Sequence, residues 1–253
     1  MKLILALSLT LLPFWGSSNQ GDEEPVSRPL DHWVQRAHLD GQAGTIVAIL
    51  HPYLTASYDP RRAGLFKVWR GSLEKHGPGY DGDMKGYSSP QGYPFEEHPV
   101  DEPGWRVLRK GKDQLAQARI ASYRIKDQKL YIKYILTLQD GQELIIEEYP
   151  EYQAVKREDN RSGFVRTFMV IAGPPDVDVM VHLEVADLIG KNDLKTSTKF
   201  SNVTRLKRMF EWGNTYRFEG DMVLDRDEPT VLEMVYTINA ETEARRRNGN
   251  SGG

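Results

Sequence analysis

The 253-residue sequence contains no cysteine. This absence excludes disulfide bonds, cysteine-ligated zinc, iron–sulfur clusters, c-type haem attachment and cysteine nucleophiles. The sequence also lacks a Gly-x-Ser-x-Gly motif, a P-loop and a dinucleotide-binding fingerprint, so it gives no sign of a serine hydrolase or a nucleotide-binding enzyme. Its histidines are scattered, and no pair has the spacing of metal ligands. We therefore predict no metal site and no bound cofactor.

A large charge of one sign is also lacking. The formal net charge is −3, which gives no electrostatic reason to expect a nucleic-acid partner. Three arginines, Arg245 to Arg247, lie in a polar C-terminal segment, but short basic runs of this kind are usually solvated. We predict that residues 241–253 form a disordered tail.

Long apolar runs are absent, and the one run near the N-terminus is short. Leu3–Leu12 follows Lys2 and precedes the small residues Gly16–Ser18, whereas a membrane-spanning helix needs about 20 residues. This arrangement is typical of a secretory signal peptide. We predict that residues 1–18 are cleaved, that residues 19–29 form a polar linker, and that the mature protein is periplasmic or extracellular with no membrane span. The alternative is an uncleaved signal anchor.

The pattern that dominates the rest of the chain has a period of two residues. In "KLYIKYILTL", residues 129–138, one face of the predicted strand carries Ile132, Tyr134 and Leu136. Asp140-Gly141 follows and predicts a two-residue hairpin turn, because both positions tolerate a positive φ.

The same pattern recurs around Asp40-Gly41 and around Lys126-Asp127-Gln128. More than ten such strands, joined by short turns over about 210 residues, indicate an all-β protein. We predict an antiparallel β-sandwich, or a large twisted two-sheet architecture, formed by a single domain over residues 30–240.

Residues 53–70 predict a further hairpin. Its turn lies in "DPRRAG", where Asp59 can accept hydrogen bonds from nearby backbone N–H groups, Pro60 fixes φ and Gly64 ends the turn. Residues 71–103 follow and are rich in glycine and proline, but they also carry several aromatic residues. A long loop of this kind is usually functional or disordered, and its aromatic residues favour function.

This region supplies the candidate ligand-binding residues. Lys67 and Trp69 are expected to share the wetter face of their strand, where an indole ring can stack on a sugar while the lysine donates to its hydroxyls. The alternative is a packed Trp69 with the stem of Lys67 lying over it. The full candidate set is Tyr58, Asp59, Lys67, Trp69, Arg70, His76, Tyr80, Asp81 and Tyr87.

Acid–base chemistry has weaker support in the sequence. Glu147 and Glu148 are neighbours on a predicted strand, so their side chains face opposite sides and cannot act as a pair. An enzyme would have to use Asp59, His76 or Asp81, and we leave open whether the protein is an enzyme.

Residues 34–71 resemble a domain of large exported bacterial proteins that also carry a sugar-dehydrogenase-like propeller and a c-type cytochrome domain. The resemblance rests on Arg36, Leu39-Asp40-Gly41, the apolar run Ile46–Leu50, Tyr58-Asp59 and the strand Lys67–Gly71. The segments "IEEYPEY" and "GFVRTFMV" extend it, so that it covers residues 33–185 and, more weakly, the chain up to 240.

This resemblance implies an exported β domain without implying a reaction. The family's His-Gly-Pro-Gln-Pro loop is replaced here by "GYSSPQGYPF", with Tyr87 at the place of the histidine. Our first hypothesis is a non-catalytic exported β-sandwich that binds carbohydrate or a partner protein through the 71–103 loop and the Trp69 strand. The alternatives are a carbohydrate-active lyase, epimerase or hydrolase, and an accessory subunit of an exported redox complex.

Overall fold

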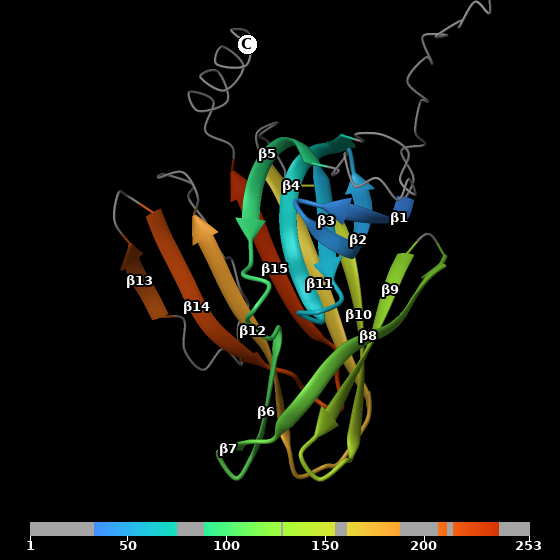
Figure 1. Ribbon diagram of the computed structural model, residues 1–253, viewed down its shortest axis with the longest axis vertical. Helices are drawn as coiled ribbons and strands as arrows, with labels where there is room; N and C mark the ends of the chain where they lie inside the picture. Colours follow the sequence, from blue (N-terminus) through green and yellow to red (C-terminus); the bar gives the residue numbers. More distant parts are fainter. Residues whose placement is uncertain are drawn as a thin grey trace, which may run out of the picture.

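The structure is a computed structural model that describes residues 33–74, 89–127, 129–154, 161–187, 207–211 and 215–237. Within these ranges every regular element is a β-strand, and the strands form three antiparallel five-stranded sheets. The described part of the chain holds no helix of the length and apolarity needed to cross a membrane. The prediction of an all-β antiparallel protein is confirmed, with the strands distributed over three sheets (Figure 1).

The three sheets are named A, B and C here, and their strands are given in spatial order. Sheet A contains β1 (Trp33–Leu39), β2 (Gln42–His51), β3 (Leu54–Asp59), β4 (Gly64–Glu74) and β5 (Ser89–Glu97). Sheet B contains β13 (Lys207–Glu211), β14 (Thr215–Val223), β12 (Asp178–Asp187), β6 (Trp105–Arg109) and β7 (Lys112–Asp113). Sheet C contains β15 (Thr230–Thr237), β11 (Arg161–Ala172), β10 (Glu143–Gln153), β9 (Lys129–Leu138) and β8 (Leu115–Lys126).

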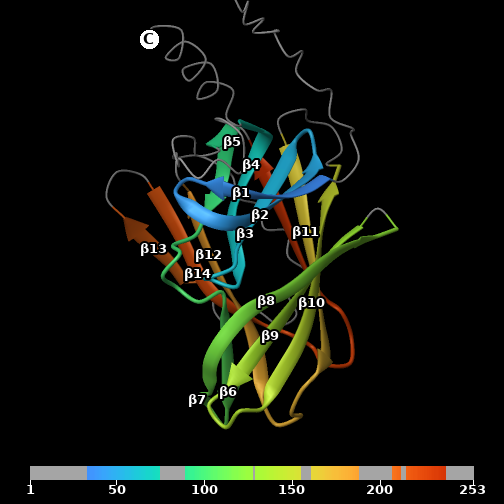
Figure 2. The same ribbon diagram turned by 45° about the vertical axis from the view of Figure 1, so that its right-hand side comes forward.

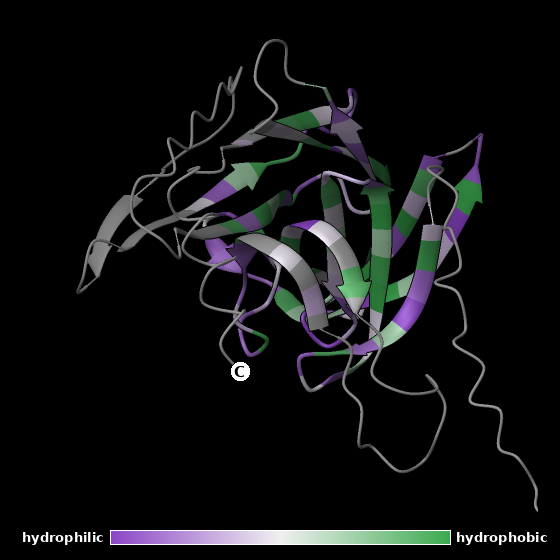
Figure 3. Ribbon diagram, turned by 90° about the horizontal axis from the view of Figure 1, so that it is seen from above, coloured by the Kyte–Doolittle hydropathy of each residue, from purple (hydrophilic) through white to green (hydrophobic). Residues whose placement is uncertain are grey.

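Sheets A and C face one another, and sheet B closes one side of the molecule. Strands β2 and β3 contact β10 and β11, while β12 lies beside β5 and β6 lies beside β8 (Figures 1 and 2). Hydropathy alternates along many of the strands, as the period of two predicts (Figure 3). The inner faces of all three sheets contribute to one main hydrophobic core, which includes Ala56, Ile132, Phe168 and Val181.

The tight turns follow from local chemistry, but one of the two Asp-Gly turns is longer than predicted. Asp40 and Gly41 have φ values of 47° and 81°, which confirms the predicted two-residue turn. At the second predicted turn, Gly141 has a positive φ of 82° and its N–H donates to Leu138 O at 3.0 Å. Because β9 ends at Leu138 and β10 begins at Glu143, this connection is longer than the two residues predicted.

The hairpin predicted over residues 53–70 is formed by β3 and β4. The carboxylate of Asp59 accepts hydrogen bonds from the N–H groups of Arg61 at 2.7 Å and Arg62 at 3.4 Å, as the turn prediction required. The residue with positive φ is Ala63, at 52°, and Gly64 already begins the next strand.

The prediction of a long loop over residues 71–103 is wrong for two segments, because both are strands. Strand β4 continues to Glu74, and β5 pairs with it along Ser89–Glu97. Prolines are tolerated because β5 is the last strand of sheet A and a bulge lies in its pairing with β4. Residues 75–88 of the predicted loop lie outside the described residues.

Candidate functional site

The structure separates the predicted ligand-binding residues instead of bringing them together. Tyr58, Asp59 and Trp69 are completely buried. Tyr58 belongs to the main core between the sheets, whereas Trp69 packs in a second, smaller cluster on the other face of sheet A. His76, Tyr80, Asp81 and Tyr87 lie outside the described residues.

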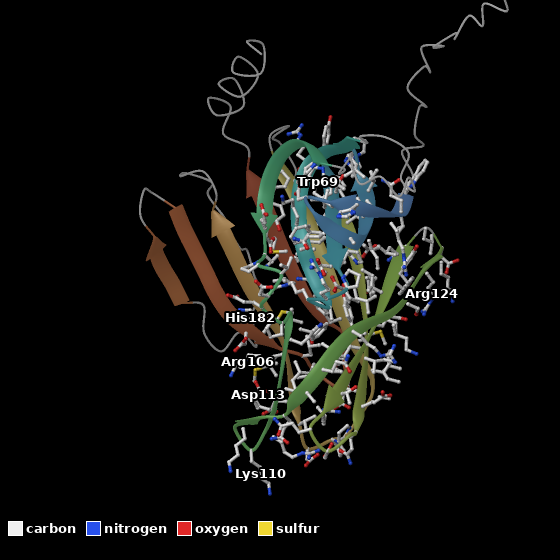
Figure 4. All side chains as sticks on the ribbon, viewed as in Figure 1. Trp69, Arg106, Lys110, Asp113, Arg124 and His182 are labelled. Atoms are coloured by element: carbon white, nitrogen blue, oxygen red, sulfur yellow. The ribbon has the colours of Figure 1, made fainter. Side chains whose placement is uncertain are left out.

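The prediction that Trp69 is a ligand platform is wrong. Its indole packs in a cluster with Leu39, Val47, Phe66 and Leu73 (Figure 4). The face that Trp69 shares with Lys67 is therefore covered, because an apolar cluster from β1, β2 and β4 closes over it. The alternative stated from the sequence, a packed tryptophan, describes the structure.

Lys67 and Asp59 have structural partners. The Lys67 ammonium lies 2.5 Å from Asp40 Oδ2 and 3.1 Å from Glu97 Oε2. The aliphatic part of the side chain is buried, and the ammonium group lies near the protein surface. The Asp59 carboxylate also accepts a hydrogen bond from the Arg61 guanidinium at 2.9 Å. Asp59 is thus a turn residue, as its simpler interpretation proposed, and it does not face a cleft.

Arg70 is the predicted residue that remains partly exposed beside aromatic groups, of which Tyr53 is exposed and the others are half-buried. Its guanidinium lies over the ring of Tyr53, 4.3 Å from the ring centroid. Tyr53 contacts His51 at 5.1 Å between centroids, and His51 stacks on Tyr152 at 3.8 Å with an interplanar angle of 5°. We call these four residues the ring cluster.

The ring cluster joins sheets A and C at one end of the molecule. His51 ends β2, Tyr53 lies in the β2–β3 turn, Arg70 lies on β4 and Tyr152 lies on β10. The Tyr53 N–H donates to His51 Nδ1 at 3.2 Å, and Ser162 Oγ donates to Tyr53 O at 2.8 Å, so the backbone of the turn is fixed.

Burial adjusts the pKa values of the ring cluster. It lowers the pKa of His51 below its ordinary value, which favours the neutral imidazole that accepts from Tyr53 N–H. Burial also raises the pKa of the Tyr152 phenol. At neutral pH both shifts favour the uncharged forms of His51 and Tyr152.

A second polar group, which sequence reasoning missed, is buried between sheets A and C. The carboxylate of Glu148 accepts two hydrogen bonds from Arg166, with Nε to Oε1 at 2.7 Å and Nη2 to Oε2 at 3.1 Å. It also accepts from the hydroxyls of Tyr58 at 3.0 Å and Tyr134 at 2.7 Å. Four donors thus satisfy this buried carboxylate.

The pKa values in this network follow from burial and pairing. Burial, together with the charge of Glu148, raises the pKa of Tyr58 and Tyr134 well above the ordinary value, so both phenols remain donors. Burial alone would lower the pKa of Arg166, but the charge and hydrogen bonds of Glu148 raise it. The Tyr58 hydroxyl, which comes from β3 of sheet A, therefore links the two facing sheets through this carboxylate of sheet C.

A third group lies next to it. His98 Nε2 contacts Glu96 Oε1 at 2.5 Å, and Tyr236 donates its hydroxyl proton to the other oxygen of Glu96. Burial lowers the pKa of His98. Burial acts to raise the pKa of Glu96, but the charge and hydrogen bond of His98 and the hydroxyl of Tyr236 bring it below its ordinary value. The arrangement is a buried Glu96 carboxylate paired with the His98 ring.

The sequence does contain the signal for these buried groups. Glu148 follows Leu144 and Ile146 at the period of two that marks the inner face of β10, and Arg166 lies between Phe164 and Phe168 on the inner face of β11. A charged residue in an apolar stripe requires a partner. The register that pairs β10 with β11 brings these two stripes together, and the sequence alone does not specify it.

Comparisons with known proteins add no relative. No protein-family model, no curated protein and no solved structure matches the chain. Within the described residues, no group of three His, Asp or Glu side chains has the geometry of a metal site. The candidate site therefore rests on the geometry of the ring cluster.

Proposed function

We propose that this protein is an exported, non-catalytic β-sheet protein that binds carbohydrate through the ring cluster of His51, Tyr53, Arg70 and Tyr152. The observation that carries the proposal is Tyr53, a residue that is 43% exposed and whose ring is held against the guanidinium of Arg70. Aromatic rings offer rigid apolar surface to the C–H faces of a sugar. A guanidinium offers several donors to its hydroxyl groups.

The connection between β4 and β5 is part of this proposal. It begins a few residues after Arg70, and its sequence carries Tyr80 and Tyr87. These residues, together with His76 and Asp81, lie outside the described residues. We propose that they add further contacts to the same ligand.

Binding without catalysis is favoured by the chemistry of the ring cluster. A glycosidase needs two carboxylates flanking the scissile bond, and the four described residues of the cluster provide none. Asp59, which an enzyme hypothesis would use, is buried and bonded to Arg61.

A glycan array with the full chain tests the proposal, followed by titration of any glycan that binds. The variant is Tyr53→Ala, which removes the exposed ring but keeps the backbone hydrogen bonds of Tyr53. We expect its affinity to fall by about tenfold or more, which corresponds to about 1.4 kcal/mol. Arg70→Gln should weaken binding as well.

The matched control is Tyr131→Ala. Tyr131 is a partly exposed tyrosine on sheet C that also has a guanidinium, that of Arg124, 4.9 Å from its ring centroid. Its replacement should leave glycan binding unchanged. The proposal is wrong if the wild type binds no glycan, or if Tyr53→Ala binds as the wild type does.

A further inference from the structure

A small pocket lies where the three sheets meet. Its volume, measured as the space open to the centre of a water molecule, is about 10 Å³, which is room for about one water-sized particle. The pocket is lined by Arg62, Gly64, Leu65, His98, Gly104, Trp105, Arg166, Val181 and His182. It is separate from the ring cluster, with which it shares no residue.

The polar walls of this pocket are nitrogen groups from four separate segments. Arg62 comes from the β3–β4 turn, His98 follows β5, Arg166 lies on β11 and His182 lies on β12. No carboxylate is among the described side chains that line the pocket. The walls are therefore basic.

Three carboxylates hold these groups without lining the pocket themselves. Glu148 binds Arg166 and Glu96 binds His98, as described above. On sheet B, Asp221 Oδ1 lies 3.0 Å from His182 Nδ1, and its other oxygen accepts from Arg106 (Figure 4). The nitrogen groups of the pocket are thus fixed in position by their partners.

Two buried guanidinium groups line the pocket. Arg62 and Arg166 are both almost completely buried, with 2% and 3% of their surface exposed. Arg62 is oriented by two backbone carbonyl groups, those of Pro99 at 2.7 Å and Glu102 at 2.9 Å. Both guanidinium charges lower the pKa of His98, so both act on the same ring. Guanidinium N–H groups form strong hydrogen bonds with anions, and Arg62 and Arg166 bring two such groups to a pocket whose described lining contains no carboxylate.

We propose that this pocket binds a monovalent anion of the size of chloride, with Arg62, Arg166 and His182 as its walls. A chloride ion is only slightly larger than a water molecule, whereas sulfate, phosphate and carboxylated metabolites exceed the space. Because its walls come from all three sheets, the bound anion ties sheets A, B and C together. The anion therefore stabilises the folded protein, because the unfolded chain has no such site.

Thermal unfolding of the full chain tests this inference. Sodium chloride is titrated against sodium gluconate at constant ionic strength, so that screening of surface charges is the same throughout. We expect the melting temperature to rise with chloride and to reach a plateau, as binding to one site requires. In Arg62→Gln and in His182→Leu, this chloride-dependent rise should be lost.

The control variant is Arg124→Gln, which removes an exposed guanidinium of sheet C that lies away from the pocket (Figure 4). It should keep the full chloride response. If the pocket variants do not fold, a crystal of the wild type soaked in sodium bromide decides the question, because bromide gives an anomalous signal. A peak between Arg62 and Arg166 supports the site.

Three results would overturn the inference. They are a chloride response that never saturates, a response that Arg62→Gln retains, and a bromide-soaked crystal in which a water molecule alone occupies the pocket. Glycan binding is measured independently, and its presence or absence does not affect any of these outcomes.

Discussion

At the scale of single residues, Trp69 and Glu148 are both completely buried, and each depends on neighbouring strands for its surroundings. A strand of alternating residues shows which side chains share a face, and Lys67 and Trp69 do share one. The alternation does not show which face is covered, because the cover over Trp69 comes from β1 and β2. Conversely, Glu148 was predicted to face away from Glu147, which is correct, yet its burial depends on Arg166 of the next strand.

Replacement of Trp69 tests its place in the smaller core cluster. Trp69→Ala should leave a cavity and lower the free energy of unfolding by about 3–5 kcal/mol. Urea unfolding measures this, with Tyr131→Ala as a partly exposed aromatic control that should change stability much less. An unchanged urea midpoint for Trp69→Ala would show that the indole is not packed.

The buried His98 predicts a dependence of stability on pH. Its pKa is lower in the folded protein than the ordinary value of 6.5, so the unfolded chain takes up a proton first as the pH falls. Stability is therefore full above about pH 6.5 and is lost as the pH falls toward the folded pKa. The lowered pKa of Glu96 acts in the same direction, but only below its ordinary value of 4.5.

Urea unfolding between about pH 7 and pH 5 measures this effect. The wild type should lose stability over this range, and His98→Gln, although less stable overall, should show a flatter profile. The slope that remains in the variant comes in part from His51, whose pKa burial also lowers. An equal slope in both proteins would show that His98 does not titrate in this way.

At the scale of elements, hairpins with a clear turn signal could be predicted, and strands without one could not. Asp40-Gly41 specified its turn because both residues adopt a positive φ. Strand β5 was missed because its prolines and Gly92 are typical of loops, whereas its pairing with β4 depends on a partner strand and on a bulge. The lengths of β4 and β5 are decided by this long-range pairing.

Gly92 is the residue on which the β4–β5 pairing depends most strictly. It has a φ of 139°, and a Cβ built there would lie 1.7 Å from Arg70 O. Gly92→Ala should therefore destabilise the protein by about 3 kcal/mol or more, since it adds a backbone clash to a strained φ.

Gly141→Ala is the matched control for Gly92→Ala. Gly141 has a φ of 82° but no atom within 4 Å of a built Cβ. Its replacement should cost only about 1 kcal/mol, the cost of the left-handed backbone conformation. Equal losses for the two variants in urea unfolding would contradict the close approach of β5 to Arg70.

At the scale of the whole molecule, the all-β class followed from the period of two, but the third sheet did not. The alternation of residues in β12 and β14 does not show that these two strands pair with each other, or that β12 also pairs with β6 to form a third sheet. That pairing brings His182 to the pocket beside His98 and Arg166. The ring cluster likewise exists because the ends of β2 and β10, which belong to two different sheets, lie close to Arg70 of β4.

We propose that carbohydrate binds at the end of the molecule where sheets A and C meet. The most direct measurement is a titration of the isotope-labelled full chain with a glycan, followed by backbone amide NMR. The account predicts shifts that saturate and that centre on His51, Tyr53, Arg70 and Tyr152, with little change at Tyr131. Shifts centred on the outer face of sheet C, or no shifts with any glycan tested, would contradict it.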